Sequence, residues 1–161
     1  MILAVDPGST ESAFVVVGED CRPRLADKIP NRELLELLDR DLGDALAIEM
    51  VASYGMPVGA EVFETVYWVG RFAQRWNHRF ADRDEAQLVY RRDIKLHHCG
   101  SVRANDANIA QALVDRFAPG EPNRGKGTKA APGWFYGFHS DLWQAYALAV
   151  YVYDTQKDPT T

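Results

Sequence analysis

The sequence contains no apolar run long enough to span a membrane, and it contains only two cysteines. A membrane-spanning helix needs roughly 20 consecutive apolar residues, but the first apolar run, residues 2–5, stops at Asp6. The same run is too short for the apolar part of a secretory signal. Cys21 and Cys99 lack the spacing of a metal-binding motif. We therefore expect a protein of the reducing cytoplasm with no membrane partner.

The sequence also lacks internal repeats and any extreme of composition. Its 161 residues are 47% hydrophobic and 25% charged, which is typical of one globular domain with a sizeable core. We expect a single domain over 1–161. Within it, residues 119–137 are rich in glycine, proline and lysine and predict a mobile basic loop, and residues 155–161 predict a short C-terminal tail.

Positive charge is scarce overall but concentrated in the middle of the chain. The net charge is −5, and it divides into −8 over residues 1–70, +5 over 71–129 and −2 over 130–161. Such asymmetry can create a local anion-binding surface on an acidic protein. A solvated basic face without a partner is the alternative.

The apolar and turn patterns predict a mixed α/β domain. Strands are expected over 2–5, 12–18, 24–29, 44–50 and 86–90. Helices are expected over 32–42, 60–79, 107–117 and about 140–154, with Asn31 capping the first and Asn105 or Asp106 the third. Three strands in succession, followed by alternating helices and strands, indicate a five-stranded sheet flanked by helices whose first three strands are antiparallel.

Three acidic residues stand at the ends of these elements. Asp6 ends the first strand, Glu49 lies at the end of the fourth, and Asp141 is expected in the first turn of the last helix. Acids at the ends of neighbouring strands can converge in the crevice where open α/β sheets bind ligands. An all-oxygen site suits Mg²⁺ or Mn²⁺, and two such ions can promote phosphodiester cleavage. A bound cation would explain why a carboxylate is tolerated at a buried strand end.

Each acid also has a simpler interpretation. Asp6 could accept hydrogen bonds from backbone N–H groups of the turn at 7–10. Glu49 could pair with an arginine. Asp141 could be an acid favoured at a helix start by the helix dipole.

Four segments occur in this order in a known family: ILAVDPGSTESAFVV, ALAIEMVASYG, IKLHHCG and DLWQAYALAVYVY. On these segments the chain resembles the RuvC-like Holliday-junction resolvases, above all their phage-encoded branch. The resemblance runs from about residue 2 to 153. It implies a ribonuclease-H-like fold, Mg²⁺ or Mn²⁺ as cofactor with two ions bound, and a homodimer acting on branched DNA in the bacterial host cytoplasm.

The resemblance also implies roles for individual residues. Asp6, Glu49 and Asp141 match the metal-binding acids of the family, and Lys95 matches a lysine near the scissile phosphate. Two positions depart from the pattern. Gln144 stands where a fourth acid is common, so it is expected as a weak ligand or as a residue that holds a metal-bound water. Asp106 falls where a second lysine is found. His139 could be a ligand, a proton shuttle or an ordinary surface histidine.

Other basic and aromatic residues are candidates for DNA contact. The expected DNA-binding residues are Tyr54, Arg71, Arg75, Arg91, Arg92, Arg103, Arg124, Lys126 and Lys129. A solvated helix face for the arginines of 60–79, and an ordinary linker at 119–137, are the alternatives. Val62, Phe63, Val66 and Tyr67 could form the contact between two subunits, or pack on the sheet instead.

The sequence therefore predicts a metal-dependent, structure-specific endodeoxyribonuclease that resolves Holliday junctions and other branched DNA. As a crossover junction endodeoxyribonuclease it would leave a 5′-phosphate and a 3′-hydroxyl, as the resemblance implies. A D-x-G-S/T turn between two strands, here Asp6 to Ser9, also occurs in actin-like ATPases and sugar kinases, so a phosphate-binding ATPase domain is one alternative. A non-catalytic protein that binds branched DNA is the other.

Overall fold

A five-stranded mixed sheet forms the centre of the protein. The computed structural model describes residues 1–53, 55 and 57–157. The strands are β1 (Ile2–Asp6), β2 (Glu11–Val17), β3 (Pro23–Pro30), β4 (Ala45–Met50) and β5 (Gln87–Tyr90). Their order is β3-β2-β1-β4-β5. β2 pairs antiparallel with both β1 and β3, and β4 pairs parallel with both β1 and β5. The predicted mixed sheet with three antiparallel strands is confirmed.

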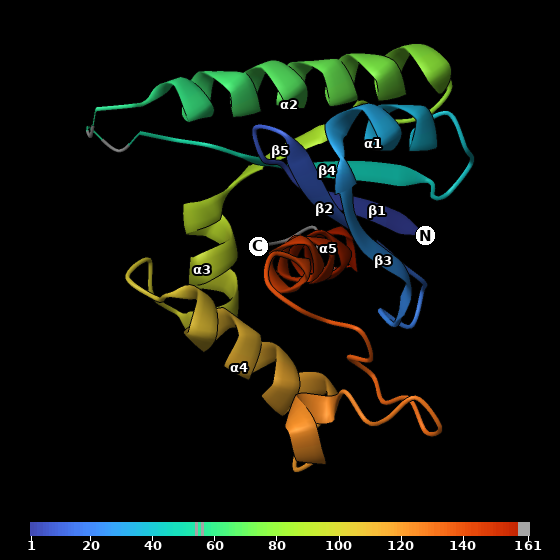
Figure 1. Ribbon diagram of the computed structural model, residues 1–161, viewed down its shortest axis with the longest axis vertical. Coiled ribbons are helices and arrows are strands. Elements are labelled where there is room, and N and C mark those ends of the chain that lie inside the picture. Colours follow the sequence, from blue (N-terminus) through green and yellow to red (C-terminus); the bar gives the residue numbers. More distant parts are fainter. Residues whose placement is uncertain (54, 56, 158–161) are drawn as a thin grey trace.

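Helices cover both faces of this sheet (Figure 1). On one face lie α1 (Asn31–Leu37) and α2 (Ala60–Arg79), and on the other lie α3 (Arg91–Cys99), α4 (Asp106–Phe117) and α5 (Leu142–Lys157). Two apolar cores result, because side chains of a strand alternate between the faces. In β1, Leu3 and Val5 pack toward α2, whereas Ile2 and Ala4 pack toward α5.

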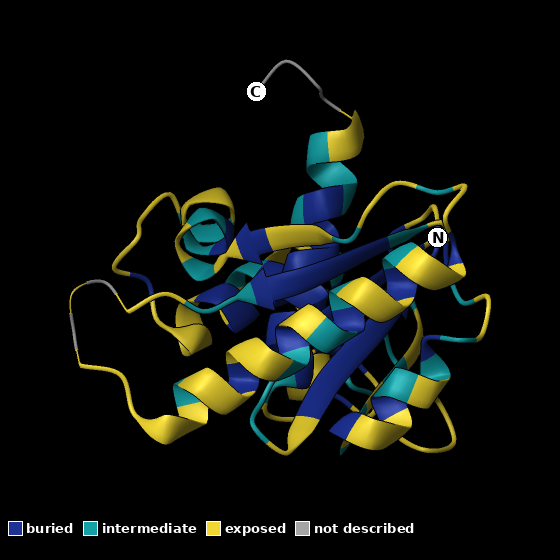
Figure 2. Ribbon diagram, turned by 90° about the horizontal axis from the view of Figure 1, so that it is seen from above, coloured by how far each residue is buried: buried dark blue, intermediate teal, exposed yellow. Residues whose placement is uncertain are grey.

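The two long helices differ in burial because they occupy different positions. α5 is buried around most of its circumference, since it packs on the sheet and is also contacted by α3 and α4. A helix that is apolar on all sides is typical of such a central position. α2 is buried only along the stripe that faces the sheet, and Figure 2 shows its outer side exposed. Within the described residues, no helix is long and apolar enough to cross a membrane.

The first helix is shorter than the sequence predicts, and Asn31 does not cap it. α1 ends at Leu37 rather than at residue 42, and Pro30 stands at the N-cap without a side-chain hydrogen bond. Asn31 is instead buried, where its Nδ2 donates to the carbonyl of Gly8 and its Oδ1 accepts from Ser12 Oγ. Its polar side chain therefore holds the turn between β1 and β2.

Other boundaries also differ from the prediction. The sequence analysis missed α3, because its nine residues are mostly polar and bury only Ile94. Asp141 lies immediately before α5 rather than in its first turn, and the helix continues to Lys157, so most of the expected tail lies outside the described residues. The α4 prediction is confirmed, with Asn105 as the side-chain cap.

The segment 119–137 is attached to the core. Phe135 is fully buried against Trp143 and Tyr146 of α5, and its backbone N–H donates to the carbonyl of Gly125 at 3.0 Å. Gly125 itself is buried and has φ of +71°, a conformation that favours glycine. The prediction of a wholly mobile loop is corrected at these two residues. Mobility of the exposed stretch between them stays a prediction.

Candidate active site

Strand register brings charged side chains into one row on the α5 face of the sheet. Lys28 of β3 pairs with Ala13 of β2, and Ala13 pairs with Asp6 of β1. The register that pairs Val5 with Ile48 places Glu49 of β4 beside Asp6. Residues opposite each other on neighbouring strands point to the same face. The row therefore contains one cation, one small residue and two acids.

Asp6 ends β1 and faces this row. Burial is the main cause that raises the pKa of Asp6 well above its ordinary range, the charges of Glu49, Asp141 and Asp106 raise it further, and Arg91 opposes them. The backbone N–H of Gly8, in the turn after Asp6, donates a hydrogen bond to Ser12 Oγ at 3.2 Å and not to the Asp6 carboxylate. Asp6 is thus a half-buried acid among other acids, an arrangement that is unfavourable unless a cation joins it.

Glu49 is 8% exposed and forms an ion pair with an arginine. Arg91, the first residue of α3, places Nη1 3.0 Å from Glu49 Oε2, and its Nη2 also contacts the carboxylate of Asp106. Burial raises the pKa of Glu49, although the positive charge of Arg91 opposes the shift. The simpler interpretation of Glu49 as an arginine partner therefore describes this structure, while the acid still lies beside Asp6.

Asp141 reaches the same crevice from the start of α5. Its backbone oxygen accepts hydrogen bonds from the N–H groups of Gln144 and Ala145, so it caps the helix through its main chain. Its side chain is bound by Lys28, with Nζ 2.6 Å from Oδ2. The sequence analysis missed Lys28, although counting residues along β1, β2 and β3 from their turns would have placed it level with Asp6.

Gln144 is the third residue of α5 and is 6% exposed. Its Oε1 is a buried oxygen without a hydrogen-bond partner among the described residues. A buried acceptor in this state costs free energy unless water or a ligand occupies it. Gln144 thus presents an oxygen without a partner among the described residues, three positions after Asp141.

Lys95 and Arg92 line the edge of the crevice. With Val102 and Arg91, the partner of Glu49, they line a cavity of about 420 Å³. The positive charge of Lys95 opposes the rise in the pKa of Glu49. The Lys95 ammonium therefore lies near that carboxylate. Three cations around one cavity make it a candidate site for a phosphate group.

The structure does not bring the other basic candidates to the acids. Arg71 and Arg75 lie on α2, on the opposite face of the sheet, where Arg75 binds both oxygens of Asp39 at 2.6 and 2.5 Å. Arg71 lies over the ring of Trp68. The remaining candidates are exposed or half-buried. Arg124 lies in the short 3-10 helix η1 (Pro122–Gly125), and Arg103, Lys126 and Lys129 lie in loops. Tyr54 lies outside the described residues.

His139 and Asp106, left open by the sequence, have distinct surroundings. His139 is exposed, and its carbonyl accepts a hydrogen bond from Leu142 at the start of α5. Asp106 begins α4 and belongs to the crevice, because it contacts Arg91 and its charge raises the pKa of both Asp6 and Glu49.

The donor types at this crevice fit a hard divalent cation. Three carboxylates and an unpaired amide oxygen offer the ligands that Mg²⁺ and Mn²⁺ prefer. In the described part of the chain, however, no three His, Cys, Asp or Glu side chains lie close enough together to hold one ion. Two of the acids have a cation of the chain as their partner, since Lys28 binds Asp141 and Arg91 binds Glu49. The residues fit a metal once these two side chains are displaced.

No family model and no curated protein matches this sequence. Solved structures do match it. The "Thermus thermophilus RuvC structure" has a TM-score of 0.62 and 19% identity, covering 99% of this chain and 96% of that chain. The structure titled "T. thermophilus RuvC in complex with Holliday junction substrate" has a TM-score of 0.56 and 17% identity, covering 98% and 95%. The chain therefore has the RuvC fold, a ribonuclease-H-like mixed sheet with flanking helices.

Proposed function

We propose that this RuvC-fold protein is a metal-dependent, structure-specific endodeoxyribonuclease that resolves Holliday junctions and other branched DNA. One observation supports this most directly: Asp6 and Glu49 lie side by side at the ends of adjacent strands, and Asp141 is near enough for its charge to raise the pKa of Asp6. The similarity to a RuvC solved with a Holliday junction substrate supports branched DNA as the substrate class.

The proposed cofactor is Mg²⁺ or Mn²⁺, with two ions per site. Asp6, Glu49 and Asp141 would hold the metal, and Gln144 Oε1 would bind it weakly or hold a water beside it. The bound ions would supply an activated water and stabilise the attacking and leaving oxygens of the phosphodiester. Cleavage is expected to leave a 5′-phosphate and a 3′-hydroxyl.

The chain's own cations would position the DNA strand. Lys95 and Arg92 border the cavity beside Glu49, where a phosphate could take the place of water. Arg91 would turn from Glu49 toward the same phosphate, because the bound metal ion would then be the partner of the Glu49 carboxylate. Arg103, Arg124, Lys126 and Lys129 would contact the backbone of the DNA arms, which gives affinity without reading sequence.

The homodimer is proposed to form through α2. Phe63 and Tyr67 are 65% and 61% exposed on its outer side, and Val66 and Tyr67 help to line a surface cavity of about 630 Å³. Large exposed apolar side chains in one patch are typical of an interface. An isologous contact would give the assembly two sites, one for each of two strands to be cut.

A labelled four-way junction tests the proposal. With Mg²⁺ or Mn²⁺ the protein should cut the junction, and it should not cut a linear duplex of the same sequence. Asp6→Asn is the matched inactive control. Binding without cleavage under all metal conditions would favour a non-catalytic junction-binding protein. Binding of ATP, without binding of the junction, would favour the ATPase alternative.

A further inference from the structure

Lys28 is an edge-strand residue whose side chain crosses to the acidic crevice. It faces Asp6 across Ala13, which is 1% exposed and contributes only a methyl group to the space between them. Neighbouring strands lie about 4.8 Å apart, so two strand spacings separate Lys28 from Asp6. A larger side chain at position 13 would fill the path that the lysine uses.

The ammonium of Lys28 faces several carboxylates at once. Its Nζ donates to Asp141 Oδ2 at 2.6 Å, between side chains that are 33% and 46% exposed. This hydrogen bond is the main cause that raises the pKa of Lys28, and the charges of Glu11 and Asp6 also contribute. Lys28 therefore carries the positive charge on the β3 side of the crevice.

The direction of this contact matters for the site. In the strand order, β3 lies on one side of β1 and β4 on the other. Lys28 therefore holds Asp141 toward the side of Asp6 that is opposite to Glu49, while Arg91 holds Glu49 from α3. With these two ion pairs in place, Asp141 and Glu49 are held on opposite sides of Asp6 and do not converge on one ion.

We propose that Lys28 is the internal counter-ion of Asp141, which a divalent cation must displace, so that Lys28 sets the metal concentration at which the site is completed. The proposal rests on the proposed function, because it takes the crevice as a metal site. Lys28 is a positioning residue here: it acts on the metal through Asp141. A merely structural lysine would weaken metal binding when removed, whereas a competing counter-ion strengthens it.

Mn²⁺ binding to the full chain without DNA, measured by calorimetry, tests this. Lys28→Met keeps the length of the side chain and removes the charge, and it should lower the Kd for Mn²⁺ by about three- to tenfold, since removing one nearby unit charge has effects of this order at partly exposed sites. Lys28→Arg should restore a Kd close to that of the native protein. Lys157→Met, at the far end of α5, removes the same charge and should leave the Kd unchanged.

The effect should also depend on Asp141. In an Asp141→Asn background, Lys28→Met should no longer tighten Mn²⁺ binding, because the carboxylate that the two cations share is gone. If the Kd of Lys28→Met is unchanged or raised while Asp6→Asn abolishes Mn²⁺ binding, the role of Lys28 is wrong and the metal site stands. Mn²⁺ binding that Asp6→Asn leaves intact would overturn the proposed function and the role of Lys28 together.

Discussion

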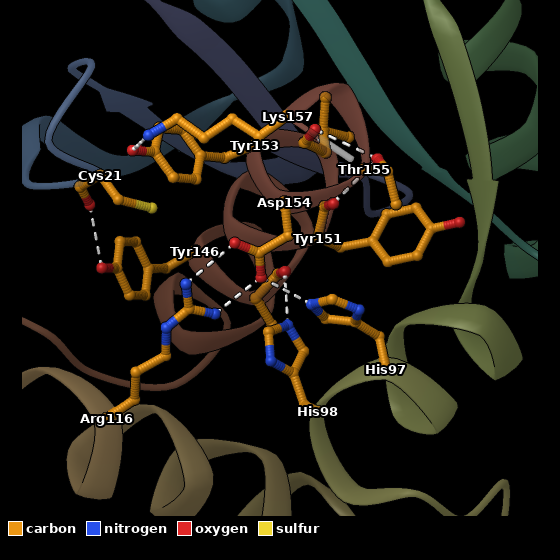
Figure 3. Close-up of polar contacts among 12 residues, drawn as sticks. Cys21, His97, His98, Arg116, Tyr146, Tyr151, Tyr153, Asp154, Thr155 and Lys157 are labelled. Carbon is orange, nitrogen blue, oxygen red and sulfur yellow. Dashed lines mark hydrogen bonds and ion pairs between the residues drawn. The ribbon is translucent and has the colours of Figure 1, made fainter. Parts of the chain in front are cut away.

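Arg116 of α4 binds both oxygens of Asp154 on α5, at 2.6 and 2.9 Å, and the three C-terminal helices meet at this pair. His97 of α3 contacts the same carboxylate at 2.7 Å (Figure 3). Burial raises the pKa of Asp154, but the hydrogen bonds from Arg116 and His97 outweigh it and hold the pKa below its ordinary value. This cluster ties α3 and α4 to α5, the helix that contains Gln144 and directly follows Asp141.

Asp154→Asn should destabilise the protein by about 1–3 kcal/mol, because it leaves the guanidinium of Arg116 without its charge-assisted hydrogen bonds and takes the carboxylate away from His97. Urea unfolding measures the change. Asp115→Asn is the matched control, since Asp115 is exposed on α4 and accepts a hydrogen bond only from Gln111 among the described contacts. Equal stability of the two variants would show that the cluster contributes nothing.

Protonation of His98 should destabilise the protein as the pH drops from about 6.5 toward 4. Burial lowers the pKa of His98 from 6.5 to about 4, although a hydrogen bond to the carbonyl of Ala147 partly offsets it. In this pH range the unfolded chain binds a proton at His98 that the folded chain does not, so protonation favours unfolding. One pKa unit corresponds to about 1.4 kcal/mol, so His98 alone should cost roughly 2 kcal/mol by pH 5.

Urea unfolding at pH 7.5, 6 and 5 measures this slope. His98→Gln should flatten it, because the glutamine does not titrate. His78→Gln is the control, since His78 is exposed near the end of α2. If His98→Gln keeps the native slope, the pH dependence comes from another group.

Asp6→Asn should abolish cleavage and stabilise the fold. The charge of Asp6 is desolvated and repelled by neighbouring acids, so an isosteric neutral amide removes an unfavourable interaction. A gain of about 1 kcal/mol would raise Tm by roughly 2–4 °C in a protein of this size. Junction binding should stay within a few-fold of native, because it depends on many phosphate contacts.

Thermal unfolding without metal, together with single-turnover cleavage, measures both effects of Asp6→Asn. Asp27→Asn on β3 is a suitable control, since Asp27 lies on the neighbouring exposed edge. Cleavage by Asp6→Asn at a near-native rate would show that Asp6 is not part of the catalytic site. A lower Tm would show that its carboxylate stabilises the fold.

Asp141→Ala and Gln144→Ala should give graded losses of cleavage. Asp141 supplies a charged ligand and its loss should reduce cleavage to background, whereas Gln144 supplies only a neutral oxygen. Loss of a residue that supports a metal ligand typically costs about 10–100-fold. Gln144→Ala should therefore remain at least about tenfold more active than Asp141→Ala and require more Mg²⁺.

Single-turnover cleavage of a four-way junction across a Mg²⁺ titration compares the two variants. Equal and complete loss would make Gln144 a full ligand. Full activity of Asp141→Ala would show that Asp141 is not a metal ligand. Asp106 would then become the next candidate, because its charge also acts on Asp6.

Parts of the fold and site that depend on local pattern could be predicted from the sequence. The buried runs of β1 and β4 predict two strands, and alternation along them places Asp6 and Glu49 on the same face as Ala4 and Ala47, which face α5. Asn105 predicts the start of α4 through its own capping hydrogen bond. The helix at 91–99 could not be predicted in this way, because it buries a single apolar residue.

The sequence by itself determined the sheet, its central strands and the acids at their ends, because periodicity and turn chemistry act between residues close along the chain. Only the tertiary structure decided that Lys28 meets Asp141, 113 residues away, and that Phe135 anchors the segment 119–137. Arg91, predicted only as a DNA contact, became the partner of Glu49 in the same way. Such contacts depend on strand register and helix packing, which bring distant segments together and leave no local signal in the sequence.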